Sequence, residues 1–168
     1  FGAGSLLVSS GNYLRINSTS TLDMSGKKPF TFECWVYLTS GHSSGGGILS
    51  MRSSAVYCPL VVKEPETFIG DGSLNGWSFL ISSGGVVGRN TWSHVALVFD
   101  GTKVRLYVNG ALDNPAASSG PHNSWPSTNN FLNIGFDADG AADGYINDLR
   151  ISDGAVYTSD FTPPTSPF

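Results

Sequence analysis

The fold is decided by one stretch near the middle of the chain, Asn90-Thr-Trp-Ser-His-Val-Ala-Leu-Val-Phe-Asp-Gly-Thr-Lys-Val-Arg-Leu-Tyr-Val-Asn-Gly110. Its first run, Val95–Phe99, has an apolar residue at every position, which is typical of a strand buried on both faces. In the second run, Lys103–Val108, apolar residues alternate with others, which predicts a strand whose second face, with Tyr107, is toward solvent. Asp100-Gly101 between the runs supplies the positive φ that a tight hairpin turn needs. The stretch therefore predicts two antiparallel neighbours in a β-sheet.

Further strand-like runs lie on both sides of this hairpin, each bounded by Gly, Ser, Asn or Asp. The predicted strands are Ser5–Ser9, Tyr13–Ile16, Phe30–Leu38, Gly47–Met51, Val56–Val62, Trp77–Ile81, Ser93–Phe99, Val104–Val108, Phe131–Ile134 and Gly144–Ile151. No ten-residue stretch carries the apolar stripe of an amphipathic helix. Two stretches, Ser40–Gly46 and Ala111–Asn130, are predicted as loops, and the second is long enough to hold a functional site. This pattern predicts an all-β sandwich.

Length and composition agree with one domain, residues 1–168, that buries a core without metal or disulfide staples. The nine basic residues are scattered and the net charge is −4, so a nucleic acid is not expected as a partner. No apolar run approaches the roughly 18 residues of a membrane helix, so membrane insertion is not expected either. Because the chain begins at Phe1, we expect the domain to be part of a longer polypeptide. The Pro-rich tail Phe161–Phe168 should run extended over the surface.

Four segments carry a family resemblance, and they follow one another along the chain. They are Gly11-Asn-Tyr-Leu14, Phe30-Thr-Phe-Glu-Cys-Trp-Val36, the quoted stretch Asn90–Gly110, and Gly144-Tyr-Ile-Asn-Asp-Leu-Arg-Ile151. They resemble the opening strand, a central strand, the hairpin and the closing strand of laminin-G-like domains in the concanavalin A-like lectin/glucanase superfamily. The resemblance spans nearly the whole chain. It implies a jelly roll of two antiparallel sheets packed face to face.

The end of the chain is similar to the ending of laminin-G-like modules in structural proteins of tailed phages. The similarity lies in Gly144–Phe168, with Asp153-Gly-Ala-Val-Tyr157 followed by Phe161-Thr-Pro-Pro164. It implies a place on a virion surface, in a tail fibre, appendage or capsid decoration, with a secreted or bacterial cell-surface protein as the alternative. The partners implied are host-surface glycans, other virion proteins, or both, and further copies of the chain in a homo-oligomer.

Residues for catalysis are not evident. Enzymes of the superfamily that cleave glucans carry an E-x-D-x-x-E run, which sets two glutamates on one sheet face. This chain has three glutamates: Glu33 stands alone, and a proline separates Glu64 from Glu66. Of three scattered histidines, His94 is interpreted as a packed side chain that is hydrogen-bonded to backbone. Motifs of metalloproteases, esterases and phosphate loops are missing from the sequence. We therefore expect a protein that is not an enzyme.

Calcium is a candidate ligand. Asp137, Asp139 and Asp143 place three carboxylates just before the closing strand, and a hard cation prefers such oxygen ligands. In the superfamily an acid of the closing strand often joins such a site, but here the matching position is Asn147, which supplies an oxygen without a charge. The alternative is that these aspartates form turns, which Asp-Gly pairs favour.

Carbohydrate binding would need exposed aromatic rings beside polar side chains. Trp35 and Trp92 lie in core-type strands and are interpreted as structural, and Trp77 likewise. Trp125 instead lies in the Pro-rich loop. Candidate glycan-binding residues are therefore Trp125, His122, Asn129 and Asn130, with the outward-facing Tyr107 as a further one. Trp125 could equally pin the loop to the sandwich.

The two cysteines, Cys34 and Cys58, leave two readings open. They could form a single disulfide, or each could be a small buried hydrophobe in an apolar run. For the whole domain three hypotheses remain: a module that contacts glycans, a structural decoration or spacer domain that binds other virion proteins, and a divergent glycan-cleaving enzyme.

Overall fold

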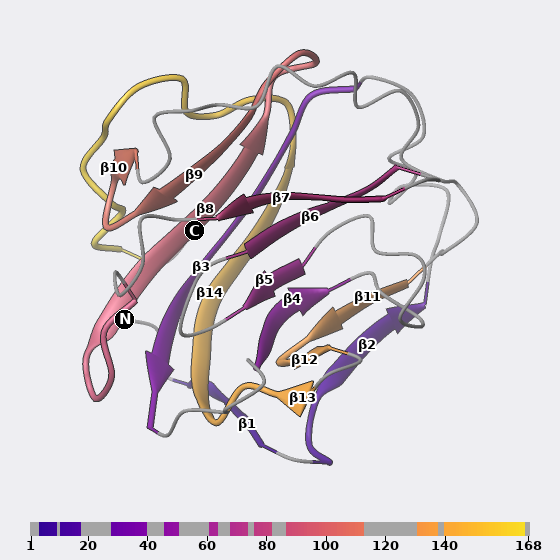
Figure 1. Ribbon diagram of the computed structural model, residues 1–168. Coiled ribbons are helices and arrows are strands. Elements are labelled where there is room, and N and C mark those ends of the chain that lie inside the picture. The colour runs from indigo at the N-terminus through magenta and orange to yellow at the C-terminus, as the bar shows by residue number, and fades with distance from the viewer. Residues whose placement is uncertain are drawn as a thin grey trace.

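The computed structural model describes residues 4–9, 11–17, 28–39, 46–50, 61–63, 68–73, 76–81, 87–112, 131–137 and 140–166. Within these residues every regular element is a β-strand (Figure 1). The strands are β1 (Leu6–Val8), β2 (Leu14–Asn17), β3 (Phe30–Leu38), β4 (Gly47–Ser50), β5 (Val61–Lys63), β6 (Phe68–Ser73), β7 (Gly76–Ile81), β8 (Trp92–Phe99), β9 (Val104–Val108), β10 (Ala111–Leu112), β11 (Phe131–Ile134), β12 (Phe136–Asp137), β13 (Gly140–Ala141) and β14 (Gly144–Asp153). The described ranges hold no helix of the length and apolarity that a membrane crossing requires.

Two sheets form the layers of a sandwich. The large sheet has the strand order β1-β14-β3-β8-β9-β10, and all its pairs are antiparallel. The second sheet has the order β12-β13-β4-β11-β2, with β5 also paired to β4, and the β6–β7 hairpin lies beside β5 (Figure 1). This arrangement confirms the all-β fold class and is consistent with a jelly-roll sandwich.

The central hairpin forms as the sequence predicts. Strands β8 and β9 pair from Val95↔Val108 to Phe99↔Val104. At the turn Gly101 has φ 95°, and Asp100 Oδ1 accepts hydrogen bonds from the backbone N–H groups of Thr102 and Lys103 at 2.8 and 2.7 Å. This aspartate therefore fixes the turn through its side chain, as Asp does in Asx turns.

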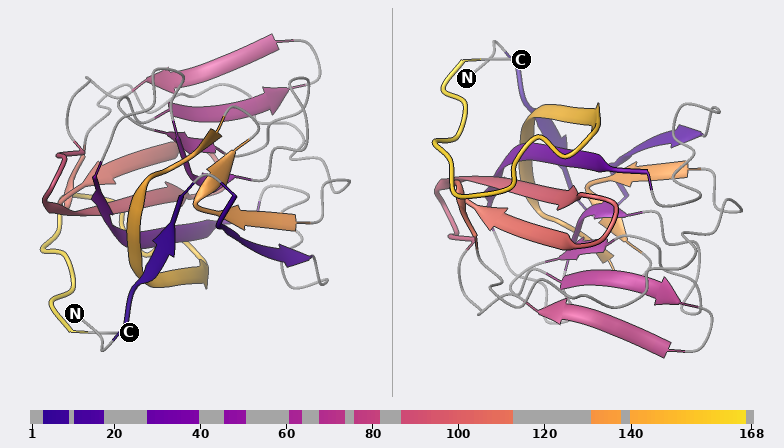
Figure 2. Two further views of the ribbon diagram at one scale, coloured as in Figure 1. Left: turned by 90° about the horizontal axis from the view of Figure 1, so that it is seen from below. Right: turned by 90° about the horizontal axis from the view of Figure 1, so that it is seen from above.

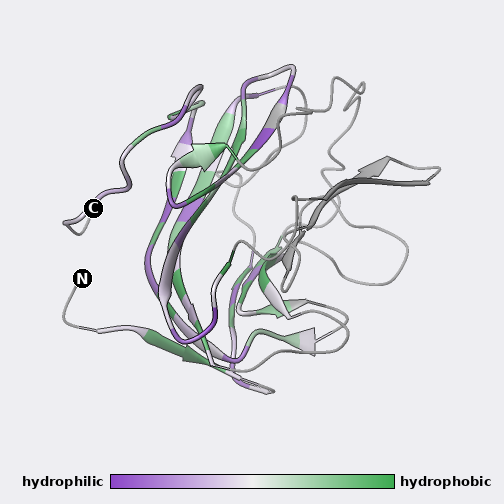
Figure 3. Cartoon of the chain, turned by 60° about the vertical axis from the view of Figure 1, so that its left-hand side comes forward, coloured by the Kyte–Doolittle hydropathy of each residue, from purple (hydrophilic) through white to green (hydrophobic). Residues whose placement is uncertain are grey.

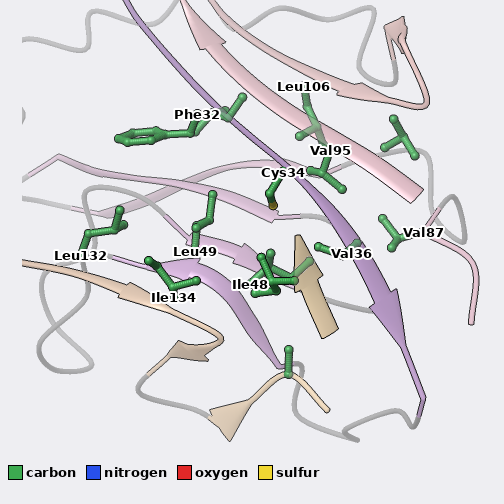
Figure 4. Packing of buried hydrophobic residues seen from close by; sticks show 14 of the residues in the cluster. Phe32, Cys34, Val36, Ile48, Leu49, Val87, Val95, Leu106, Leu132 and Ile134 are labelled. Carbon is green, nitrogen blue, oxygen red and sulfur yellow. The ribbon is translucent and has the colours of Figure 1, made fainter. Parts of the chain in front are cut away.

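The main core lies between the two sheets. Side chains from alternate positions of β3 and β8 point inward and meet side chains of β4 and β11, and the close view shows this packing (Figure 4). The buried residues of the core are Val8, Phe30, Phe32, Cys34, Val36, Leu38, Ile48, Leu49, Val87, Val95, Leu97, Phe99, Leu106, Val108, Leu132, Ile134, Ala142 and Ile146. Burial of these side chains is the main stabilising contribution to the fold.

Four short strands were not predicted from the sequence: β6, β10, β12 and β13. Strand β6 reads Phe-Ile-Gly-Asp-Gly-Ser, and its two glycines and aspartate are poor strand formers. The other three strands have two residues each, too few for an alternation to be seen. The remaining predicted strands match observed ones to within a few residues, although residues 56–60 of the fifth lie outside the described ranges.

The segment after β14 lies on the outside of the large sheet. Residues 154–166 contain no strand and cross the large sheet, from Thr31 on β3 to Gly110 beside β10 and Leu112 in β10 (Figure 2). Figure 3 shows the same segment on the outer side of this sheet, away from the second sheet. Residues 161–166, the described part of the predicted tail, contain no strand. The segment covers a face that a two-layer sandwich would otherwise leave to solvent.

Candidate functional site

The candidate site lies on the outer face of the large sheet, where ionisable and aromatic side chains of the described residues contact one another. Because side chains alternate along a strand, residues that are register partners point to the same face. Four cross-strand sets follow one another on this face: Leu7–Tyr145–Tyr37–Trp92, Asn147–Trp35–His94, Arg150–Glu33–Ala96–Tyr107 and Ser152–Thr31–Val98–Arg105. Adjacent sets are two residues apart on each strand, except at a bulge in β14. We call Tyr145, Tyr37 and Trp92 the aromatic row.

The third set is built around Glu33, whose side chain is fully buried. Its carboxylate accepts hydrogen bonds from Arg150 Nε at 2.6 Å and from the Tyr157 hydroxyl at 2.8 Å. His94 Nε2 lies 3.2 Å from the same carboxylate. A register shift between Asn147 and Arg150 brings the guanidinium opposite Glu33. We call Glu33, His94, Arg150 and Tyr157 the Glu33 network.

The network holds its carboxyl group ionised and its tyrosine neutral. Burial alone would raise the pKa of Glu33, but the hydrogen bonds from His94, Tyr157 and Arg150 outweigh it and hold the pKa below its ordinary value. Burial, together with the hydrogen bond to Glu33, raises the pKa of Tyr157 to about 12. At neutral pH the site therefore contains one anion that three donors surround.

The C-terminal segment covers this part of the face. The rings of Tyr157 and Phe161 stack with centroids 3.5 Å apart, and Phe161 meets Tyr107 at 5.3 Å and His94 at 5.7 Å. The Phe161 N–H donates to the Gly110 carbonyl at 2.9 Å. Tyr107 is consequently 0% exposed. The prediction that Tyr107 faces solvent as a glycan-binding residue is wrong, because a segment about fifty residues later packs on its ring.

The first set is not covered in this way. Tyr145 is 39% exposed and Leu7 is 55% exposed, whereas Tyr37 and Trp92 are half-buried. The ring centroid of Tyr37 lies 5.6 Å from that of Trp92 and 6.2 Å from that of Tyr145. Trp92, interpreted as structural, does lie in a central strand, but its side chain points to the outer face and not into the core. Its neighbour Ser93, the register partner of Val36, takes the inward position.

The second set lies between the open and the covered parts. Trp35 is also half-buried on the outer face rather than in the core, and its ring meets the edge of His94 at 5.3 Å. His94 is packed, as predicted, but its ring faces the Glu33 carboxylate and not the backbone. The alternation of Phe30–Leu38 could have shown this, because Glu33 and Trp35 fall on the face opposite Phe32 and Cys34. Nothing local in the sequence signals that Arg150 and Tyr157 meet Glu33.

The predicted glycan-binding loop lies outside the described residues. Trp125, His122, Asn129 and Asn130 all lie outside the described residues, as does the side chain of Trp77. Of the predicted glycan-binding residues only Tyr107 is described.

The calcium candidates are described in part. The backbone of Asp137 lies in β12, and Asp139 lies outside the described ranges. The Asp143 carbonyl accepts the Thr39 N–H at 2.9 Å and fixes the entry to β14. Asn147 is buried; its Oδ1 accepts the Asp148 N–H at 2.8 Å, and its Nδ2 has no partner among the described residues. Among described residues no three acidic, His or Cys side chains gather as metal ligands would.

Of the two cysteines, the structure describes Cys34. Cys34 is a free and fully buried thiol, and burial raises its pKa to about 12. Cys58 lies outside the described residues. Cys34 acts in the core as a small apolar side chain.

The fold is similar to several solved structures. Domain 4 of AbnA, an extracellular arabinanase of Geobacillus stearothermophilus solved with arabinotriose, is 17% identical with a TM-score of 0.60, over 89% of this chain and 71% of that chain. The binding domain of botulinum neurotoxin serotype D is 16% identical with a TM-score of 0.65, over 90% of this chain and 39% of that chain. A Bacteroides ovatus protein whose suggested role is carbohydrate binding is 19% identical with a TM-score of 0.64, over 90% and 45%. At these identities the likeness shows the fold alone.

The match to a family model shows the family of the chain as well as its fold. No curated protein matches the chain by sequence, and the chain spans less than half of the neurotoxin domain and of the Bacteroides protein. The model described as concanavalin A-like lectin/glucanases superfamily, Laminin_G_3, matches residues 8–160. The matched range contains all fourteen described strands except the first two residues of β1. The chain therefore belongs to the Laminin_G_3 family of the concanavalin A-like lectin/glucanase superfamily.

Proposed function

We propose that this domain is a non-catalytic interaction module that contacts host-surface glycans from a phage virion, in a tail fibre, appendage or capsid decoration. The lectin-like character is supported by the superfamily and by the similar folds, whose descriptions include an arabinotriose complex and a carbohydrate-binding role. The phage context is supported by the similarity of Gly144–Phe168 to modules of tailed-phage proteins. A secreted or bacterial cell-surface protein is the alternative location.

The state of Glu33 carries the choice between binding and catalysis. A glycan-cleaving enzyme needs two carboxyl groups that face each other across the bound sugar, as acid and as nucleophile or base. Glu33 is fully buried under the C-terminal segment, and His94, Arg150 and Tyr157 occupy its oxygens. Glu33 links β3 to β14 and to the C-terminal segment, and its burial supports a structural role over a catalytic one. A binding module needs no such pair, so the observation favours binding.

A glycan array tests the proposal directly. The purified domain is screened with calcium and with a chelator, alongside the Trp125→Ala variant. Binding that both changes abolish supports a calcium-dependent site in the Trp125 loop and the Asp137–Asp143 loop. Binding that survives both supports a glycan-binding module with its site elsewhere. Absence of binding to every glycan would contradict the proposal, and release of reducing sugar from any glycan would favour the enzyme hypothesis.

A structural decoration domain is the second candidate, and the edge strand β2 favours it. Leu14 and Ile16 on β2 are exposed, and β2 pairs only with β11 among the described strands. An edge strand with apolar side chains is a surface on which another chain can pair or pack. This candidate predicts cosedimentation of the domain with purified virions, lost in a Leu14→Lys variant and unaffected by free glycans. Cosedimentation that Leu14→Lys leaves unchanged would contradict this use of β2.

A further inference from the structure

We infer that the aromatic row, Tyr145, Tyr37 and Trp92 on the outer face of the large sheet, is a carbohydrate-binding surface for a neutral glycan chain. The inference rests on the proposed function and places its site on described residues rather than on the Trp125 loop. The row crosses β14, β3 and β8 at one register level, and Leu7 of β1 continues it.

The row has a length that suits an extended ligand. Neighbouring strands lie about 4.8 Å apart, so the four positions from β1 to β8 span about 15 Å across the sheet. The rings are tilted against one another by 56° and 64°, and they form a continuous series of ring contacts. A chain of several sugar rings can therefore lie across the strands and meet an aromatic side chain at successive positions.

The chemistry of the row matches one face of a sugar ring. The C–H groups on that face pack on aromatic rings, while the hydroxyl groups at the ring edge need polar partners. Such partners lie at the end of the row: the Asn90 N–H donates to the Leu38 carbonyl, which brings the exposed Arg89 and Asn90 to the end of β3. Asp143 meets Thr39 at the same end. Among the described residues this rim holds one cation, Arg89, and one anion, Asp143, and this balance favours a neutral glycan over an acidic one.

A buried amide next to the row gives an independent indication. Asn147 lies one register level behind Tyr145 on the same face, and its Nδ2 is buried without a hydrogen-bond partner in the described structure. Buried donors of this kind are rare in native proteins unless water or a ligand satisfies them. A ligand hydroxyl or an ordered water that reaches this nitrogen would remove the unsatisfied donor.

The row also differs from the rest of the outer face in what covers it. Two levels away Ala96 and Tyr107, and three levels away Val98, pack under Tyr157 and Phe161 of the C-terminal segment. Tyr145 and Leu7 instead remain 39% and 55% exposed. Exposed apolar side chains that are grouped, rather than scattered singly, mark interaction sites on soluble proteins.

Matched variants test the inference. The domain is screened on an array of neutral and sialylated oligosaccharides, and the affinity for the best neutral binder is then measured by titration calorimetry. We expect Tyr145→Ala to weaken that affinity about tenfold, because it removes one stacked ring. Tyr145→Phe keeps the ring and should stay within about twofold of the parent. Tyr13→Ala is the control, since Tyr13 has a similar exposure, 37%, but lies outside the row and stacks on Phe136.

The outcomes separate this inference from the proposed function. Absence of binding by the parent domain would overturn the proposed function, and the inference with it. Binding that Tyr145→Ala leaves unchanged, or that Tyr13→Ala weakens equally, would overturn the inference and leave the proposed function standing. Binding to sialylated glycans alone would overturn the neutral ligand. Circular dichroism of each variant shows that a lost affinity is not a lost fold.

Discussion

Replacing one buried atom should show how strongly the C-terminal segment depends on Glu33. The substitution Glu33→Gln keeps the shape of the side chain and removes its charge. In the parent protein the Glu33 carboxylate accepts hydrogen bonds from Arg150, Tyr157 and His94. Arg150 and His94 lie on the sheet, whereas Tyr157 lies on the C-terminal segment. We therefore expect the substitution to destabilise the domain and to loosen residues 154–166.

The size of the effect follows from the donors around the new amide. If the NH2 group of this amide faces Arg150, two hydrogen-bond donors meet and neither has an acceptor. If the NH2 group faces His94, Nε2 must become an acceptor and the imidazole proton must move to Nδ1. That nitrogen is buried and has no partner among the described residues. Breaking a fully buried ion pair costs about 3–5 kcal/mol. Because the Arg150 side chain remains 34% exposed and keeps part of its hydration, we expect a loss of about 2–3 kcal/mol.

Urea denaturation measures this loss, and hydrogen exchange at the Phe161 amide reports on the segment. Asp153→Asn, the same chemical change at an exposed carboxylate, should stay within about 0.5 kcal/mol of the parent. Because the pKa of Glu33 lies below the ordinary 4.5, its contribution is complete above that pH and is lost as the pH falls through the lowered value. The parent and Glu33→Gln should therefore converge only in acid. Equal stability of the two at pH 7 would refute the reasoning.

Three further changes probe the same region and the core. Gly110→Ala should destabilise the domain more than Gly11→Ala, as measured by urea denaturation. Both glycines have a positive φ, 81° and 88°, but only at Gly110 would the new Cβ lie 1.9 Å from the Phe161 carbonyl oxygen. Phe161→Ala removes the ring stacked on Tyr157 and should cost about 2 kcal/mol by the same measurement, because the ring is half-buried. In a Cys58→Ser background, Cys34, whose pKa burial raises to about 12, should react with a thiol reagent at pH 8 only after unfolding, and fast labelling of the folded domain would contradict its burial.

The sequence predicts what local alternation decides. The runs around Val95–Phe99 and Lys103–Val108 give the hairpin, its turn and its inward face, because a strand's period of two and the Asp-Gly turn are local properties. The family resemblance extends this to the sandwich, which the family match confirms. Strand β6 was missed because its glycines carry no alternating pattern.

Alternation does not reveal what covers a face. Tyr107 alternates with buried residues and so was predicted to face solvent, but its burial depends on Phe161, which arrives from the other end of the chain. Likewise Arg150 reaches Glu33 only because β14 carries a bulge, where Asp148 adopts a positive φ of 48°. Such contacts between distant segments belong to the packed molecule, and one sequence without aligned relatives carries no signal for them.

The Glu33 network and the aromatic row both place large rings on the outer face of the sheet, but only the first is covered by the C-terminal segment. A sandwich buries the inner faces of its sheets and leaves the outer faces to water, so large rings on an outer face need a cover or a use. At the Glu33 network the chain supplies the cover itself, in Tyr157 and Phe161, and secures it with a buried anion. At the aromatic row Tyr145 stays 39% exposed, beside the exposed Leu7. Exposed apolar side chains that are grouped in this way mark interaction sites. For this reason the inferred glycan surface lies where the C-terminal segment does not reach.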